Sequence, residues 1–242
     1  MNKLLTTLFA LAVASVTSFA HAQASAPAQQ KASTAAPAAK PAAPAAAGGA
    51  KSIESKVAMC IGCHGIKGYQ ASFPEVHKVP MISGQSAKYI VAALTAYKNG
   101  DRKHPTMRGI ADTLSEQDMN DIAAYYESHG KEEGKTLADK PSKEPSPQVA
   151  ALMQKAACVS CHGANFAKPL DPSYPKIAGQ HADYMFVALK AYKAENNPAV
   201  GRSNGIMGAI AKQFSNAELK ELANYVGSLE GDLKVKPENK FR

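Results

Sequence analysis

Large aromatic side chains are scarce in this sequence. Its 242 residues include no tryptophan, 7 phenylalanines and 9 tyrosines, and alanine inflates the 45% of hydrophobic residues. Two domains of about 90 residues built from so few large side chains would be marginally stable without a staple. The composition therefore indicates that something other than side chains fills the centre of each domain.

Concentrated charge and long apolar runs are also missing. The formal net charge of +8 is spread along the chain, with no arginine-rich helix or basic–aromatic stripe, so we expect no nucleic-acid partner. Alternating patterns typical of β-strands are absent, and no segment after residue 22 is apolar enough to cross a membrane.

The N-terminus has the parts of an export signal. Lys3 supplies a positive charge, residues 4–19 are apolar, and Ala20-His21-Ala22 is a small-residue cleavage site. We predict that residues 1–22 are a signal peptide and that the mature protein lies in the periplasm. An uncleaved signal would instead associate the protein with the membrane. Residues 23–50, rich in Ala and Pro, predict a flexible linker, which is either a spacer or a leftover.

Beyond residue 50 the sequence repeats once, in the same order at every landmark. The three repeated runs are Cys60-Ile-Gly-Cys63-His64 with Cys158-Val-Ser-Cys161-His162, Pro80-Met-Ile-Ser-Gly84-Gln85 with Pro175-Lys-Ile-Ala-Gly179-Gln180, and Met107-Arg-Gly-Ile110-Ala111 with Met207-Gly-Ala-Ile210-Ala211. Copies this long are domains rather than solenoid units. We predict one domain at 51–140 and another at 141–242, joined through the charged, Pro-rich stretch 131–147.

Helical patterns occur in both copies. Ser115-x-x-Asp118 and Ser215-x-x-Glu218 match the capping box, and apolar residues follow each serine at i, i+3, i+4, i+7 spacing. Stretches starting at Ser86 and at Ala182 have helical spacing too. The sequence predicts an all-α fold.

Each Cys-x-x-Cys-His run is an attachment motif for a c-type haem. Its two thiols can reach the two vinyl groups of a porphyrin edge, and His64 or His162 is then held where its imidazole can bind the iron. A buried porphyrin also supplies the apolar bulk that the aromatic residues do not. We predict two haem c groups, bound covalently through Cys60, Cys63, Cys158 and Cys161.

Zinc sites, redox-active dithiols and structural disulfides also use paired cysteines. A paired zinc site wants its second cysteine pair about 15–20 residues away, whereas here the pairs lie 98 residues apart. A thioredoxin-like dithiol belongs to a strand–helix context that the sequence lacks. Disulfides suit an exported protein with four cysteines, but they give no reason for a His-Gly to follow both pairs.

The second axial ligand sets the relative stability of ferrous and ferric iron, because a thioether raises the reduction potential and a second histidine lowers it. Met107 and Met207 lie 43 and 45 residues after their histidines, at equivalent repeat positions. We predict that both bind iron, each from a loop, and that the other methionines serve packing. His104 is a competing ligand with no counterpart near Asn204, and His77 is expected on a surface loop.

Two further pairs of residues have mainly structural interpretations. The Gly-Gln dipeptides at 84–85 and 179–180 open helices, so we expect turn geometry and capping from them. Tyr97 and Tyr192 fit apolar stripes, which favours packing over hydrogen bonds to haem propionates.

Over residues of roughly 54–230, these combined motifs resemble the dihaem cytochrome c4 family. The resemblance implies two tandem class I cytochrome c domains facing one another, with His64 and Met107 on one iron and His162 and Met207 on the other. It implies electron transfer in the periplasm between redox partners such as a membrane quinol-oxidising complex and a terminal oxidase. The Ala/Pro segment before residue 50 departs from the family, which leaves tethering or a specialised partner open.

We therefore expect an electron carrier rather than an enzyme. A dihaem peroxidase or a thiosulfate-type dehydrogenase would need an open iron or an extra cysteine. Here the two attachment motifs use all four cysteines, and both copies offer a methionine. The remaining alternative is the cytochrome subunit of a larger dehydrogenase, whose haem domains would look alike.

Overall fold

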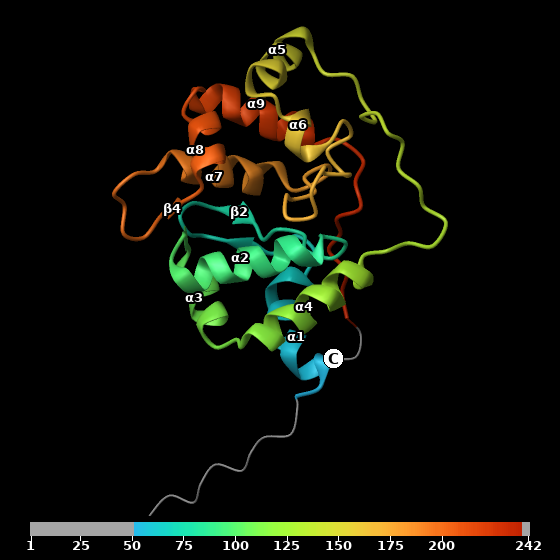
Figure 1. Ribbon diagram of the computed structural model, residues 1–242, viewed down its shortest axis with the longest axis vertical. Helices are drawn as coiled ribbons and strands as arrows, with labels where there is room; N and C mark the ends of the chain where they lie inside the picture. Colours follow the sequence, from blue (N-terminus) through green and yellow to red (C-terminus); the bar gives the residue numbers. More distant parts are fainter. Residues whose placement is uncertain (1–50, 239–242) are drawn as a thin grey trace, which may run out of the picture. The chain divides into compact units, whose positions relative to one another are not determined.

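Short helices dominate both copies in the computed structural model, which describes residues 51–238 (Figure 1). The first copy contains α1 (Ile53–His64), β1 (Gln70–Ala71), β2 (His77–Lys78), α2 (Ala87–Asn99), β3 (Arg102–Lys103), α3 (Pro105–Asp112) and α4 (Glu116–His129). The second contains α5 (Pro147–Ala156), α6 (Val159–His162), α7 (Ala182–Lys193), β4 (Gly201–Arg202), α8 (Gly205–Ala211) and α9 (Asn216–Gly227). The strands have two residues each, so the predicted helical fold is confirmed.

The predicted signal peptide and linker, residues 1–22 and 23–50, lie outside the described residues. Within residues 51–238, no helix combines the length and the apolar character needed to cross a bilayer.

The last helix of each copy forms as its sequence predicts. Ser115 caps α4 and Ser215 caps α9, and in both helices the third residue returns a hydrogen bond to the cap backbone. The predicted stripes are buried in both helices: Met119, Ile122, Ala123 and Tyr126 in α4, and Leu219, Leu222, Ala223 and Val226 in α9. Each stripe faces the centre of its own copy and fixes one wall of it.

The repeated Pro-x-Ile-x-Gly-Gln run packs tightly against the end of this last helix. Gly84 has a φ of +89°, which favours glycine, and its N–H donates to the Tyr126 carbonyl at 2.8 Å. A Cβ atom on Gly130 would lie 2.0 Å from the Gly84 nitrogen. In the second copy the Gly179 N–H donates to the Val226 carbonyl at 3.1 Å, so both runs are held in the same way.

The two copies are in direct contact within one compact unit. Helix α7 packs on β2 (Figure 1). Strand β3 pairs with β4 in antiparallel register, with Arg102 opposite Arg202. After α9 the chain returns to the first copy, where the Lys234 N–H donates to the Ser83 carbonyl at 3.0 Å. The domain boundaries at 51–140 and 141–242 stay a prediction, because this C-terminal segment contacts the first copy.

The expected surface position of His77 is wrong. Its side chain lies in β2 and is only 4% exposed, because the hairpin of β1 and β2 turns it under the second copy. Its Nδ1 contacts the Glu75 carbonyl at 2.8 Å, and its ring lies 6.1 Å from the ring of Tyr184.

Candidate haem sites

The first attachment motif lies on one continuous helix. Ser52 caps α1, and the helix runs unbroken through Cys60, Cys63 and His64. Both cysteines are free thiols, and burial raises the pKa of Cys60 to about 11. Cys60 packs, partly buried, against the hydrophobic core of this copy.

The second motif is reached by a different backbone path. Helix α5 ends at Ala156, Ala157 adopts the left-handed region with a φ of +50°, and the short α6 carries the chain to His162. Cys158 and Cys161 are free thiols, and burial raises the pKa of Cys158. The same three side chains thus reach the centre of this copy after a break in the helix.

Both motif histidines are held by one hydrogen bond from the same nitrogen. His64 Nδ1 donates to the Pro80 carbonyl at 2.7 Å, and His162 Nδ1 donates to the Pro175 carbonyl at 3.0 Å. A carbonyl only accepts, so the proton is on Nδ1 and the lone pair of Nε2 is free to bind a metal. Burial lowers the pKa of both imidazoles, which keeps them neutral, as iron ligation requires.

The predicted methionine ligands lie on helices rather than on loops. Met107 is the third residue of α3 and Met207 is the third residue of α8. The loop expectation is wrong because His104 and Asn204 cap these helices: the Met107 N–H donates to His104 Nδ1 at 3.3 Å, and the Met207 N–H donates to Asn204 Oδ1 at 2.9 Å. The caps fix each methionine backbone within the first turn.

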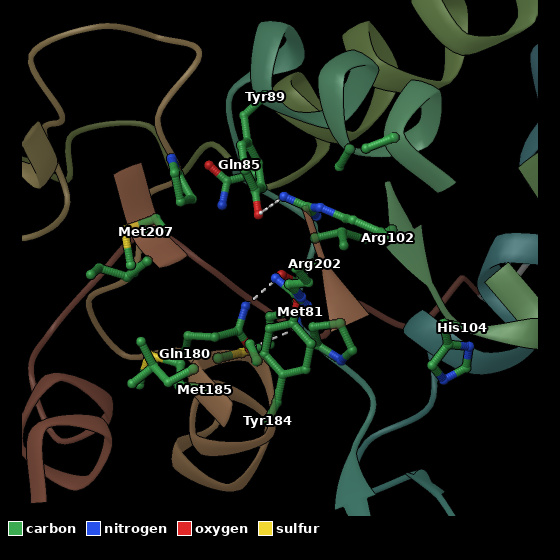
Figure 2. Close-up of a pocket in the computed structure, with 18 of the residues that line it drawn as sticks. Met81, Gln85, Tyr89, Arg102, His104, Gln180, Tyr184, Met185, Arg202 and Met207 are labelled. Atoms are coloured by element: carbon green, nitrogen blue, oxygen red, sulfur yellow. Dashed lines mark hydrogen bonds between the residues drawn. The ribbon is translucent and has the colours of Figure 1, made fainter. Parts of the chain in front are cut away.

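The competing ligand His104 already has a structural role. Its Nδ1 accepts the capping hydrogen bond, and its ring makes edge contacts with Phe73 and Tyr97. Figure 2 places His104 apart from the cluster of labelled side chains. Asn204 makes the same cap in the second copy, so this position needs a capping side chain but not a histidine.

An apolar cavity of about 730 Å³ connects both motifs. Its lining includes all eight predicted site residues: Cys60, Cys63, His64, Met107, Cys158, Cys161, His162 and Met207. Met81 and Met185 also line it, so the repeat position, rather than the cavity alone, favours Met107 and Met207 as ligands. Their ligation of iron stays a prediction.

Two arginines that our reading of the sequence missed meet between the copies. Arg102 donates to the Tyr89 hydroxyl at 3.1 Å, and Arg202 donates to the Tyr184 hydroxyl at 3.0 Å (Figure 2). Neither arginine forms an ion pair with a carboxylate within residues 51–238. Two like charges directly opposite in a strand pair repel, so this position favours an anion.

A signal for these arginines is present in the repeat. Each arginine stands five residues before the methionine of its own copy, Arg102 before Met107 and Arg202 before Met207. Tyr97 and Tyr192 pack against the guanidiniums, with ring centroids 5.7 and 5.5 Å from them. We expected Tyr97 and Tyr192 to pack, and they do, but the arginines against which they pack were not part of that expectation.

The residues around the cavity fit haem c part by part. Free thiols match its vinyl groups, a neutral imidazole with a free Nε2 matches its iron, and the apolar walls match the macrocycle. The two arginines without acidic partners match its propionate carboxylates. This complementarity occurs in each copy.

Known proteins share both the sequence and the fold. The Cytochrome c family matches residues 47–130 and again residues 146–230. Cytochrome c4 of Stutzerimonas stutzeri is 30% identical over 203 residues, covering 76% of this chain and 90% of that protein. The thiosulfate dehydrogenase electron acceptor of Stutzerimonas stutzeri strain A1501 is 28% identical over 205 residues, covering 75% of this chain and 82% of that protein.

Among solved structures, reduced recombinant cytochrome c4 from Pseudomonas stutzeri matches with a TM-score of 0.53 and 30% identity. The match covers 76% of this chain and 100% of that one. The tandem arrangement of two cytochrome c domains and the presence of two haem c groups follow from these matches together with the two attachment motifs.

Proposed function

The chain belongs to the cytochrome c family as a dihaem cytochrome of the c4 type, and on that premise we propose that it is a periplasmic electron carrier that passes electrons between respiratory-chain components towards a terminal oxidase. In the proposed ligation, His64 and Met107 bind one iron and His162 and Met207 bind the other. The main support for this ligation is that a histidine and a methionine at matching repeat positions line the same cavity in each copy.

Such a site leaves no iron position for a substrate. The haem iron supplies a one-electron change of oxidation state, and the protein supplies ligands, burial and hydrogen bonds that set its potential. His64 and His162 are held through Nδ1, and the apolar walls would shield irons bound there from water. The chemistry that remains is electron transfer without bond making, which argues against an enzyme.

Electrons must enter and leave where the cavity reaches the surface. Met59 and Ile206 line the cavity and are 53% and 61% exposed. Met59 precedes Cys60 directly, and Ile206 precedes Met207 directly. Exposed apolar side chains beside the sites suit brief docking of a redox protein, so each copy offers its own port.

Ligation can be measured on the purified oxidised protein. The near-infrared band from methionine to ferric iron, quantified per haem, is expected to correspond to two methionine-ligated irons. One high-spin iron, as in a dihaem peroxidase, or one bis-histidine iron would overturn the carrier proposal. Met107→Ala and Met207→Ala are each expected to remove half of the band, which assigns it to the two copies.

A second candidate is the electron-accepting subunit of a dehydrogenase. The observation in its favour is the 28% identity to a protein named thiosulfate dehydrogenase electron acceptor. Copurification distinguishes the two: a stoichiometric catalytic partner supports the subunit, and recovery of the free cytochrome supports the carrier.

Export and membrane association are tested together. We expect N-terminal sequencing of the periplasmic protein to begin at Gln23, because residues 1–22 have the signal pattern. Recovery of the uncleaved chain in the membrane fraction would instead make residues 23–50 a tether.

A further inference from the structure

Two glutamines cross between the copies in a reciprocal pattern. Gln180 of the second copy accepts from the Met81 N–H at 3.0 Å and donates to the Met81 carbonyl at 2.9 Å (Figure 2). Gln85 of the first copy accepts from the Lys176 N–H at 3.0 Å and donates to the Lys176 carbonyl at 3.0 Å. Each side-chain amide thus pairs with the backbone of the other copy as a neighbouring strand would.

These contacts lie one peptide group away from the motif histidines. The carbonyl of Pro80 and the N–H of Met81 belong to the same peptide unit, whose carbonyl accepts from His64 and whose N–H donates to Gln180. In the second copy the peptide between Pro175 and Lys176 accepts from His162 and donates to Gln85. A planar, conjugated peptide transmits polarisation, so hydrogen bonds at its two ends strengthen one another.

Both glutamine side chains are buried, and both amides are engaged in hydrogen bonds. Gln85 and Gln180 are 4% and 5% exposed, and each also accepts from the backbone N–H of the residue that follows it, Ser86 or His181. Losing the amide would leave a partly buried N–H and a partly buried carbonyl of the opposite copy without these partners. The cross-copy bonds are therefore specific features of the interface rather than surface contacts.

We propose that Gln180 is a positioning residue for the iron of the first copy, and Gln85 for the iron of the second, each acting through one peptide and one histidine. The proposal rests on the ligation by His64 and His162 proposed above. A stronger hydrogen bond at Nδ1 makes an imidazole a more basic ligand, which stabilises the ferric state. Each copy thereby lowers the potential of the other's iron, and the contact between copies tunes both.

Single substitutions separate this cross-copy effect from a local one. Gln180→Leu is expected to change the reduction equilibrium of the first iron by about fivefold, a rise of about 40 mV at 59 mV per tenfold. The second iron, in the copy that carries the substitution, is expected to move by less than half as much. Gln85→Leu is expected to give the opposite pattern.

The measurement is an NMR-monitored redox titration of the full two-haem protein, in which each haem has its own methyl signals. Gln154→Leu, an exposed glutamine on α5, is the matched control and is expected to shift neither iron. A larger shift at the iron of the substituted copy, equal shifts at both irons, or no shift at either would overturn the proposal.

A second variant guards against misfolding. Gln180→Asn keeps the amide but is one methylene too short to make both bonds to Met81, and it is expected to shift the first iron in the same direction. Faster exchange of the His64 ring N–H in D₂O is expected in either variant, and unchanged exchange would contradict the relay. The wild-type near-infrared band reports on ligation separately, so failure of the ligation proposal is distinguished from failure of the relay.

Discussion

The two copies hold their histidines in the same way on different backbones. In the first copy α1 runs unbroken to His64, whereas in the second the helix breaks at Ala157 before α6. Both histidines nevertheless donate from Nδ1 to the carbonyl of the proline that opens the next repeated run. The position of the imidazole, rather than the helix beneath it, is what the duplication has kept, and this is the geometry that an iron ligand needs.

The copies also differ in the ion pairs made by the last helix of each copy. The first copy has a partly buried lysine between two carboxylates of α4: Lys56 Nζ lies 2.9 Å from Asp118 and 2.5 Å from Asp121. The corresponding Glu218 and Glu221 of α9 form no ion pair within residues 51–238. We therefore expect the two copies to respond differently to acid and to substitution.

Exchanging the proposed methionine ligand should have the largest effect. Met207→His replaces a thioether by an imidazole and is expected to lower the potential of the second iron by about 0.1–0.3 V, within the ~0.8 V range that axial ligands span. Met107→His should do the same to the first iron. Protein-film voltammetry measures both, and an unchanged pair of potentials would rule out ligation by the substituted residue.

Acid should weaken the first copy more than the second. Hydrogen bonds from Lys56 hold the pKa of Asp118 and Asp121 below the ordinary value of 3.8. A carboxyl with a lowered folded-state pKa stabilises the fold fully above its unfolded value, and this stabilisation is lost as the pH falls through the folded value. We expect the loss to begin below about pH 4.

Lys56→Met should flatten this acid dependence, because the carboxyls of Asp118 and Asp121 then return towards their ordinary pKa. Urea midpoints measured between pH 6 and pH 2, about the range in which such carboxyls titrate, provide the test. Lys220→Met, at an exposed lysine of α9 that forms no ion pair within residues 51–238, is the control in the second copy and should leave the slope unchanged. Equal slopes for wild type and Lys56→Met would contradict the prediction.

Removing a helix cap should have a smaller effect, confined to one copy. Asn204→Ala leaves the Met207 N–H without its acceptor and should cost about 1 kcal/mol, as for other N-caps. The near-infrared methionine band of the second iron should then disappear at a lower temperature, while that of the first persists. Loss of both bands at the same temperature would indicate that the copies unfold together.

The break at Ala157 should give the smallest effect. Ala157→Gly relieves a left-handed alanine and should stabilise the protein by about 0.5 kcal/mol. Met59 precedes Cys60 as Ala157 precedes Cys158, but it lies inside α1, so Met59→Gly should destabilise by about 1 kcal/mol. Urea unfolding measures both, and the same sign for the two substitutions would show that the difference in backbone does not matter.

Local patterns were sufficient to predict much of the molecule. The capping boxes at Ser115 and Ser215 and the stripes after them depend only on residues within two turns, and the structure confirms them. The attachment motifs are equally local. Met107 and Met207 line the cavity as their repeat position suggests, but the caps that begin α3 and α8 were missed because neither His104 nor Asn204 was read as a cap.

Contacts between the copies could not be read from the same patterns. Gln85 and Gln180 directly precede α2 and α7, whose N-caps are Ser86 and His181 without a side-chain cap, so the expected capping is wrong. Their amides instead bind residues about a hundred positions away. His77 is buried because the second copy covers it, and the residues around it in the sequence do not predict this burial. Arg102 and Arg202 are an exception among these contacts, because their equal spacing from Met107 and Met207 is a pattern that the sequence contains.

The C-terminal segment that returns to Ser83 has a consequence for assembly. In a chain delivered N-terminus first, the residues that close this contact follow both cysteine motifs, and so does Lys236, which donates to the His129 carbonyl at 2.9 Å. The first copy therefore completes these contacts only after the whole second copy has been delivered.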